Sequence, residues 1–116
     1  MSLNMVGINM GIPTTSGLKT FDNTDVSQSI LASSTVVIQT ISGKGSAHLA
    51  TAGDGDMQVN MAVSVDGGAD VVFGTADTEI DVDYAFHVSL AIKATNTDSG
   101  GAHMSSSVSS TGVTQA

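Results

Sequence analysis

Hydrophobic and polar residues alternate over a long stretch, from Asp77 to Thr95. Even-numbered positions from 80 to 92 carry large apolar side chains, whereas the odd-numbered positions of the stretch carry acidic, small or polar ones. A helix would scatter these apolar side chains around its circumference, but a strand places them on one face. We expect one long curved strand, or two strands separated by a bulge or kink near residues 83–85. The predicted buried positions are Ile80, Val82, Phe86, Val88 and Leu90, with Glu79, Asp81 and Asp83 facing solvent or a partner.

Shorter segments upstream show the same alternation. One runs from Met57 to Val65, and Asp66-Gly67 followed by the apolar residues 71–73 predicts a hairpin. Residues 35–41 form a mixed apolar run closed by glycines 43 and 45, and residues 47–51 could pair with it before a Gly-Asp turn at 53–56. Short turns leave no room for crossover helices. The predicted fold class is all-β, an antiparallel β-sandwich or small jelly roll with extended terminal arms.

The two ends of the chain differ from its middle, although residues 1–116 are predicted to form a single domain. Residues 3–12 alternate up to Pro13, as an edge strand or arm would, and residues 26–34 are ambiguous between a helical turn and a strand. Residues 98–116 are rich in Ser, Thr and Gly, and fixing each backbone residue costs roughly 1–2 kcal/mol. We therefore predict that arms 1–13 and 98–116 become ordered through other subunits. The subunit-contact candidates are Val6, Ile8, Met10, Ile12, Met104 and Val108.

Charge and composition exclude several partners. Eleven acidic residues stand against three lysines and no arginine, a formal net charge of −8, so nucleic acid and anionic membranes are not expected partners. The chain has no cysteine, which removes disulfides and thiolate chemistry. It has neither a secretory signal pattern at its N-terminus nor an 18-residue apolar stretch.

Candidate chemistry is sparse, and no cofactor is predicted. The histidines at 48, 87 and 103 lack the close spacing of a zinc site, and Gly-x-Ser-x-Gly is absent. Residues 43–46 resemble the end of a phosphate-binding loop, but the leading glycine is missing. We therefore expect no enzymatic activity. Four acids in a turn and on the long alternating stretch could bind calcium through oxygen ligands: Asp54, Asp56, Asp81 and Asp83.

The sequence resembles small β-rich accessory proteins of bacteriophage particles, the head decoration (cement) and tail-associated modules. The likeness lies in the absence of cysteine, the abundance of Gly, Ser, Thr and Val, and the hairpin Val-Ser-Val-Asp-Gly-Gly at residues 63–68. It implies a non-enzymatic structural protein of the virion that forms a homo-oligomer and binds a capsid or tail protein. The alternative is an extracellular carbohydrate-binding or adhesive module, calcium-assisted, for which Tyr84 and Phe86 are the two neighbouring aromatic residues.

Overall fold

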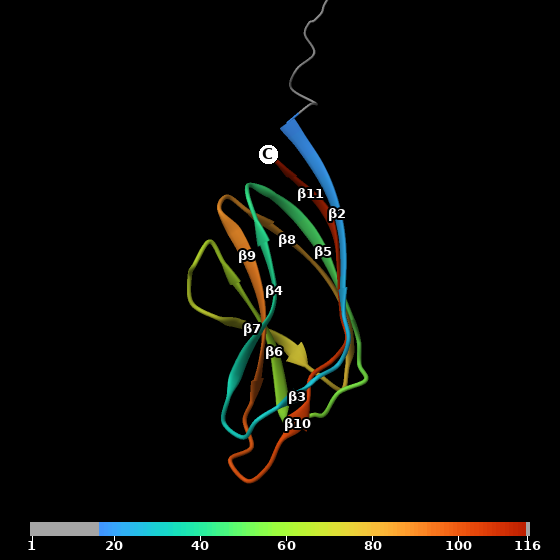
Figure 1. The fold of residues 1–116 in the computed structure, drawn as a ribbon, viewed down its shortest axis with the longest axis vertical. Coiled ribbons are helices and arrows are strands. Elements are labelled where there is room, and N and C mark those ends of the chain that lie inside the picture. The colour runs from blue at the N-terminus through green and yellow to red at the C-terminus, as the bar shows by residue number, and fades with distance from the viewer. Residues whose placement is uncertain (1–16, 116) are drawn as a thin grey trace, which may run out of the picture.

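The computed structural model describes residues 17–115 as an antiparallel β-sandwich (Figure 1). The predictions for arm 1–13, including Val6, Ile8, Met10 and Ile12, lie outside the described residues. The strands are β2 (Leu18–Asp25), β3 (Ser29–Ile30), β4 (Thr35–Ser42), β5 (Gly45–Ala52), β6 (Val59–Val65), β7 (Val71–Thr75), β8 (Glu79–Phe86), β9 (Ser89–Asn96), β10 (His103–Met104) and β11 (Val108–Gln115).

Two four-stranded sheets form the layers of the sandwich. The first sheet has the order β2-β11-β5-β8 and the second has the order β4-β9-β6-β7, while β3 and β10 pair as a short ribbon at one end. Every pairing is antiparallel. The all-β sandwich predicted from alternation is therefore confirmed.

Connections between strands repeatedly cross from one sheet to the other, and this corrects two predictions. The long alternating stretch forms two strands, the second of the two alternatives expected, but the break falls at residues 87–88 and not near residues 83–85, and β8 lies in the first sheet whereas β9 lies in the second. Residues 47–51 do not pair with residues 35–41 either, because β5 pairs with β11 and β8 whereas β4 pairs with β9. Alternation identifies the buried face of a strand, but it does not identify the sheet that the strand joins.

The predicted register of β8 and β9 is confirmed. Phe86 and Leu90 are buried, Ile80 and Val82 are half-buried, and the three acids of β8 are exposed. Val88 is an exception, being 65% exposed, because it lies in the turn between the two strands and not on either sheet. The largest fully buried apolar side chains come from both layers: Phe86, Ile30, Leu49, Met61, Leu90, Ile92, Val59, Val63 and Val108.

The turn at residues 87–88 is held by a carboxylate from a different hairpin. Asp66 and Gly67, with φ of 54° and 74°, are the central residues of a tight turn that the Gly68 N–H closes on the Val65 carbonyl oxygen at 2.9 Å, at the start of the 66–70 connection to β7. Asp66 Oδ1 accepts hydrogen bonds from the backbone N–H groups of His87, Val88 and Ser89 at 2.8, 2.7 and 3.2 Å. The hairpin predicted at Asp66-Gly67 is confirmed, and it also fixes the point where the chain passes between sheets.

A buried polar bridge links the two layers inside the core. Gln39 on β4 donates from Nε2 to the carbonyl oxygen of Val108 at 3.3 Å, and it accepts from the hydroxyl of Ser110 at 2.6 Å. Both side chains are buried, Ser110 fully. Because buried polar groups need partners, this bridge fixes the position of β4 relative to β11.

The C-terminal segment belongs to the domain itself, which corrects the prediction that residues 98–116 become ordered only through other subunits. β11 lies inside the first sheet and pairs with β2 on one side and β5 on the other. Its inward-facing positions are Val108, Ser110, Gly112 and Thr114, and the ring of Phe21 lies close over Gly112. Small residues leave room for this aromatic ring, so few large anchors are needed.

Candidate interaction surfaces

The outward face of the first sheet carries the densest set of unburied acids. Register aligns Asp83 with His48, His48 with Thr111, and Thr111 with Asp22, in one row across four strands. Asp81 and Glu79 follow Asp83 on the same side of β8, two residues apart. The surrounding outward positions are small. We call this surface the acidic face and define it by Asp22, Ser46, His48, Ala50, Glu79, Asp81, Asp83, Ala85, Ser109, Thr111 and Val113.

His48 lies between two carboxylates on the acidic face. Its Nδ1 is 2.7 Å from Asp83 Oδ1 and its Nε2 is 3.1 Å from Asp81 Oδ1. The hydrogen bond to Asp83, and then the bond to Asp81, raises the pKa of His48 above its usual 6.5. All three side chains remain accessible to solvent, and the imidazole therefore offsets part of the local negative charge without removing the carboxylates from the surface.

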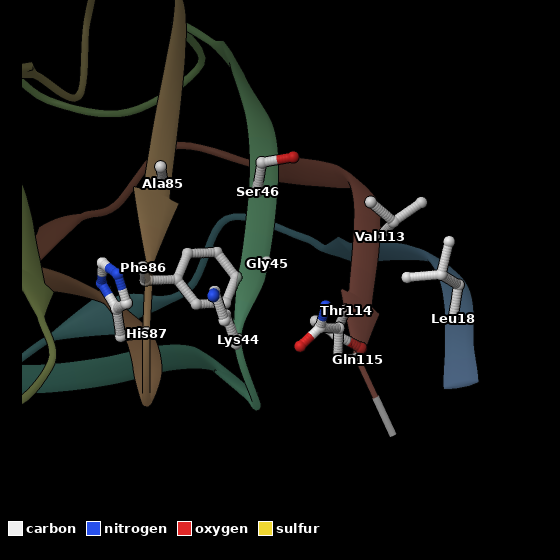
Figure 2. A pocket seen from close by; sticks show the side chains of 10 residues that line it. All are labelled: Leu18, Lys44, Gly45, Ser46, Ala85, Phe86, His87, Val113, Thr114 and Gln115. Carbon is white, nitrogen blue, oxygen red and sulfur yellow. The ribbon is translucent and has the colours of Figure 1, made fainter. Parts of the chain in front are cut away.

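Two shallow hollows flank this row. One, of about 250 Å³, is lined by Ser46, Ala85 and Val113 on adjacent strands and by Leu18 at the end of β2 (Figure 2). The other, of about 280 Å³, lies toward the opposite end of the strands and is lined by Thr24, Ala50, Ala52, Ser107 and Ser109, among others. Both linings are mainly apolar, because the outward side chains are short and expose methyl groups and backbone.

A second candidate surface lies at the end of the sandwich that holds the β3–β10 ribbon, at the bottom of Figure 1. Four large apolar side chains are exposed there, three on connections between strands and one on β10. Their exposed fractions range from 37% to 74%. We call this surface the apolar end, and its members are Val26, Leu31, Met57 and Met104.

Hydrogen bonds hold the connections of the apolar end in place. His103 on β10 lies 3.2 Å from Asp56 through Nδ1 and 2.8 Å from Asp98 through Nε2. Asp56 also accepts from the Met104 N–H at 2.9 Å. The bond to Asp98 is the main factor raising the pKa of His103, and backbone N–H groups of Met104 and Gly100 lower the pKa values of Asp56 and Asp98.

The four calcium candidates do not come together. Asp81 and Asp83 contact His48 on the acidic face, whereas Asp54 and Asp56 accept hydrogen bonds from the segment around residues 103–107. The Ser107 hydroxyl and N–H lower the pKa of Asp54. Within residues 17–115, no group of three or more His, Asp or Glu side chains has the arrangement of a metal site.

The two subunit-contact candidates that lie within the described residues differ in burial. Val108 is 1% exposed and packs in the core, so its assignment to a subunit contact is wrong. Met104 is on the surface and lies at the apolar end. Tyr84 and Phe86 lie on the core side of β8, as the alternation predicts: Tyr84 is half-buried against the core with Phe73, their ring centroids 6.5 Å apart, and Phe86 is buried.

Sequence reasoning missed the apolar end and the His103 bridge. Val26 and Met57 each stand alone among polar residues, Leu31 follows the buried Ile30, and nothing in their spacing indicates that the fold gathers their segments. For the His103 bridge, the sequence shows only that the chain contains histidines. The fold brings His48 and His103 each against two aspartates.

Comparison of the chain with protein-family models, with curated proteins and with solved structures gives no match. In residues 17–115, no helix has the length and apolar character needed to cross a membrane.

Proposed function

We propose that this chain is a non-enzymatic structural protein that self-associates and binds a protein lattice, as a capsid-decoration or tail-associated component of a virion. The observation that carries the proposal is the apolar end. Large apolar side chains exposed together on a small domain mark protein contacts. Here the connections that carry them are held by hydrogen bonds, so little conformational entropy is lost when a partner covers them.

Charge favours a second copy of the chain as the occupant of the apolar end. The Asp56 and Asp98 carboxylates there share one imidazole, His103, whose raised pKa favours its cationic form. Like-charge repulsion between two copies is therefore weaker at this end than at the acidic face, where one imidazole bonds two of four carboxylates. A symmetric pair or ring meeting through the apolar end would leave the sheet faces free for the lattice.

Sedimentation equilibrium tests self-association. The full chain should have a mass that is a multiple of 11.6 kDa. The double variant Leu31→Ser/Met57→Ser should weaken association by at least about tenfold, because two exposed apolar anchors are lost. Val88→Ser is the matched control, since Val88 is equally exposed but lies at the opposite end of the sandwich. A chain that stays monomeric at high micromolar concentration, or a control that dissociates as much as the double variant, would contradict the proposal.

The virion assignment needs a separate experiment. The chain is co-expressed with the products of the genes that flank its own, and assembled capsids or tails are isolated by sedimentation. Retention of the chain on these particles in a fixed ratio supports the assignment. Recovery of the chain only in the unsedimented fraction, with particles assembled, would overturn it.

A further inference from the structure

Ten of the eleven acidic residues of the chain fall into two groups with different surroundings, and Asp25, half-buried at the end of β2, belongs to neither. In one group the carboxylate bonds to the chain's own turns and connections, or to a lysine. Asp54 and Asp66, for example, accept backbone N–H groups, and Asp70 binds Lys93 at 2.8 Å. These charges are already used to fix the fold. The members of this group are Asp54, Asp56, Asp66, Asp70, Asp77 and Asp98.

The other group is concentrated on the acidic face. Asp22, Glu79, Asp81 and Asp83 lie on strands, point outward and are exposed, and His48 is the side chain that bonds two of them. Four acids are thus held on one side of one sheet with no role in a turn. Like charges on neighbouring outward positions repel, so the arrangement weakens the sheet unless a bound cationic group offsets the repulsion.

The lysines do not balance this face. Lys19 lies on the opposite side of β2 by register, where it aligns with Thr114. Lys93 is bound to Asp70 on the second sheet. Lys44 lies in the turn between β4 and β5 and is one of the residues that line the first hollow, beyond the rows that carry the acids. The acidic face therefore presents negative charge over its central rows.

The shape of the face admits long cationic side chains. The outward residues around the acids are short, and apolar hollows of about 250 and 280 Å³ lie on both sides of the row containing His48. Lysine and arginine place an apolar stem along such surfaces and keep the charged group at the end. The hollows and the carboxylates together match both parts of these side chains.

We infer that the acidic face binds a lysine- or arginine-rich surface of another protein, with the cationic groups at Asp81, Asp83 and Asp22 and their stems in the two hollows. This rests on the proposed assembly function and names the chemistry of the lattice surface. A second copy does not fit, because the same four carboxylates would oppose one another. Nucleic acid does not fit for the same electrostatic reason.

The test uses a decalysine peptide as the probe and the full, isotope-labelled chain, followed by amide chemical shifts. Shifts should concentrate on outward positions of β5, β8 and β11, and they should weaken with added salt. Asp81→Asn/Asp83→Asn should reduce affinity by about tenfold or more, whereas the control Asp70→Asn/Asp77→Asn should change it by less than about threefold. Both variants remove two negative charges, so the difference between them reports location and not net charge.

Three outcomes would overturn the inference. The first is equal weakening by the two double variants, and the second is a set of shifts centred on the second sheet. The third is saturable shifts of the same amides on adding calcium chloride alone, which would make the face a metal site. Self-association is measured on the same samples. If the unaltered chain forms the oligomer but does not bind the peptide, this inference alone is refuted. If it is a monomer that binds the peptide through the acidic face, only the proposed self-association is refuted.

Discussion

The bridge between Gln39 and Ser110 predicts strong coupling between two positions 71 residues apart in the chain. Ser110→Ala leaves the Gln39 Oε1 atom buried without its donor, and Gln39→Met leaves the Ser110 hydroxyl without its acceptor. An orphaned buried polar group costs about 1–3 kcal/mol. Each single substitution should therefore lower the free energy of unfolding by that amount.

The double variant Gln39→Met/Ser110→Ala leaves neither side chain orphaned. What remains is the loss of the Nε2 bond to the Val108 carbonyl oxygen, which at 3.3 Å is the longer of the two bonds. Replacing both partners with apolar groups of similar shape is close to neutral, about 0.5–1.5 kcal/mol for the bonds removed. We expect the double variant to be more stable than the sum of the single effects by at least about 1 kcal/mol.

Urea unfolding of the four proteins at one fixed protein concentration measures this coupling. With a slope of about 1–3 kcal/mol per molar urea, the single variants should shift the midpoint by roughly 1 M. The reasoning is refuted if the two single effects add to the double effect within about 0.5 kcal/mol, because the two side chains would then be independent.

Three further predictions concern the core, one cluster and one glycine. Phe86→Ala should destabilise by about 3–5 kcal/mol, whereas Val88→Ala should change the free energy of unfolding by less than about 1 kcal/mol, as urea midpoints will show. Because the pKa of His103 is raised in the folded chain, the protonated imidazole adds stability below its usual pKa of 6.5, and this stability is lost as pH rises through the folded pKa. The thermal midpoint of the unaltered chain should therefore fall between pH 6 and 8, and that of His103→Gln should fall less steeply. Gly112→Ala should destabilise strongly, because a Cβ would lie 2.1 Å from the Ser46 carbonyl oxygen, while Gly101→Ala, with open space around it, should not; circular dichroism melts distinguish them.

The strands could be predicted from sequence because alternation is local, but their partners could not. Glu79 to Phe86 shows which side of the strand is buried, yet nothing in it indicates that β8 lies beside β5. The turn at His87-Val88 contains neither glycine nor proline. It depends on the carboxylate of Asp66, and a contact between residues 21 to 23 positions apart leaves no local pattern.

The C-terminal segment was misjudged because composition was weighed above periodicity. Ser, Thr and Gly are typical of disordered tails, but in residues 108–114 the even positions point inward and are small enough to pack against Phe21 and β5. The candidate surfaces were partly predictable. Alternation placed Asp81 and Asp83 outward, whereas His48 joins them only through the register of β5 with β8.

The central place of β11 in the first sheet constrains the order of events during synthesis. β2 is made early, yet among the described strands its one partner is β11, the last to be made. Until residues 108–115 have left the ribosome, β2 and β5 each lack a neighbour and expose hydrogen-bonding edges. The first sheet must therefore close after translation of this segment, through contacts that span almost the whole chain, which makes folding slow and the nascent chain prone to aggregate.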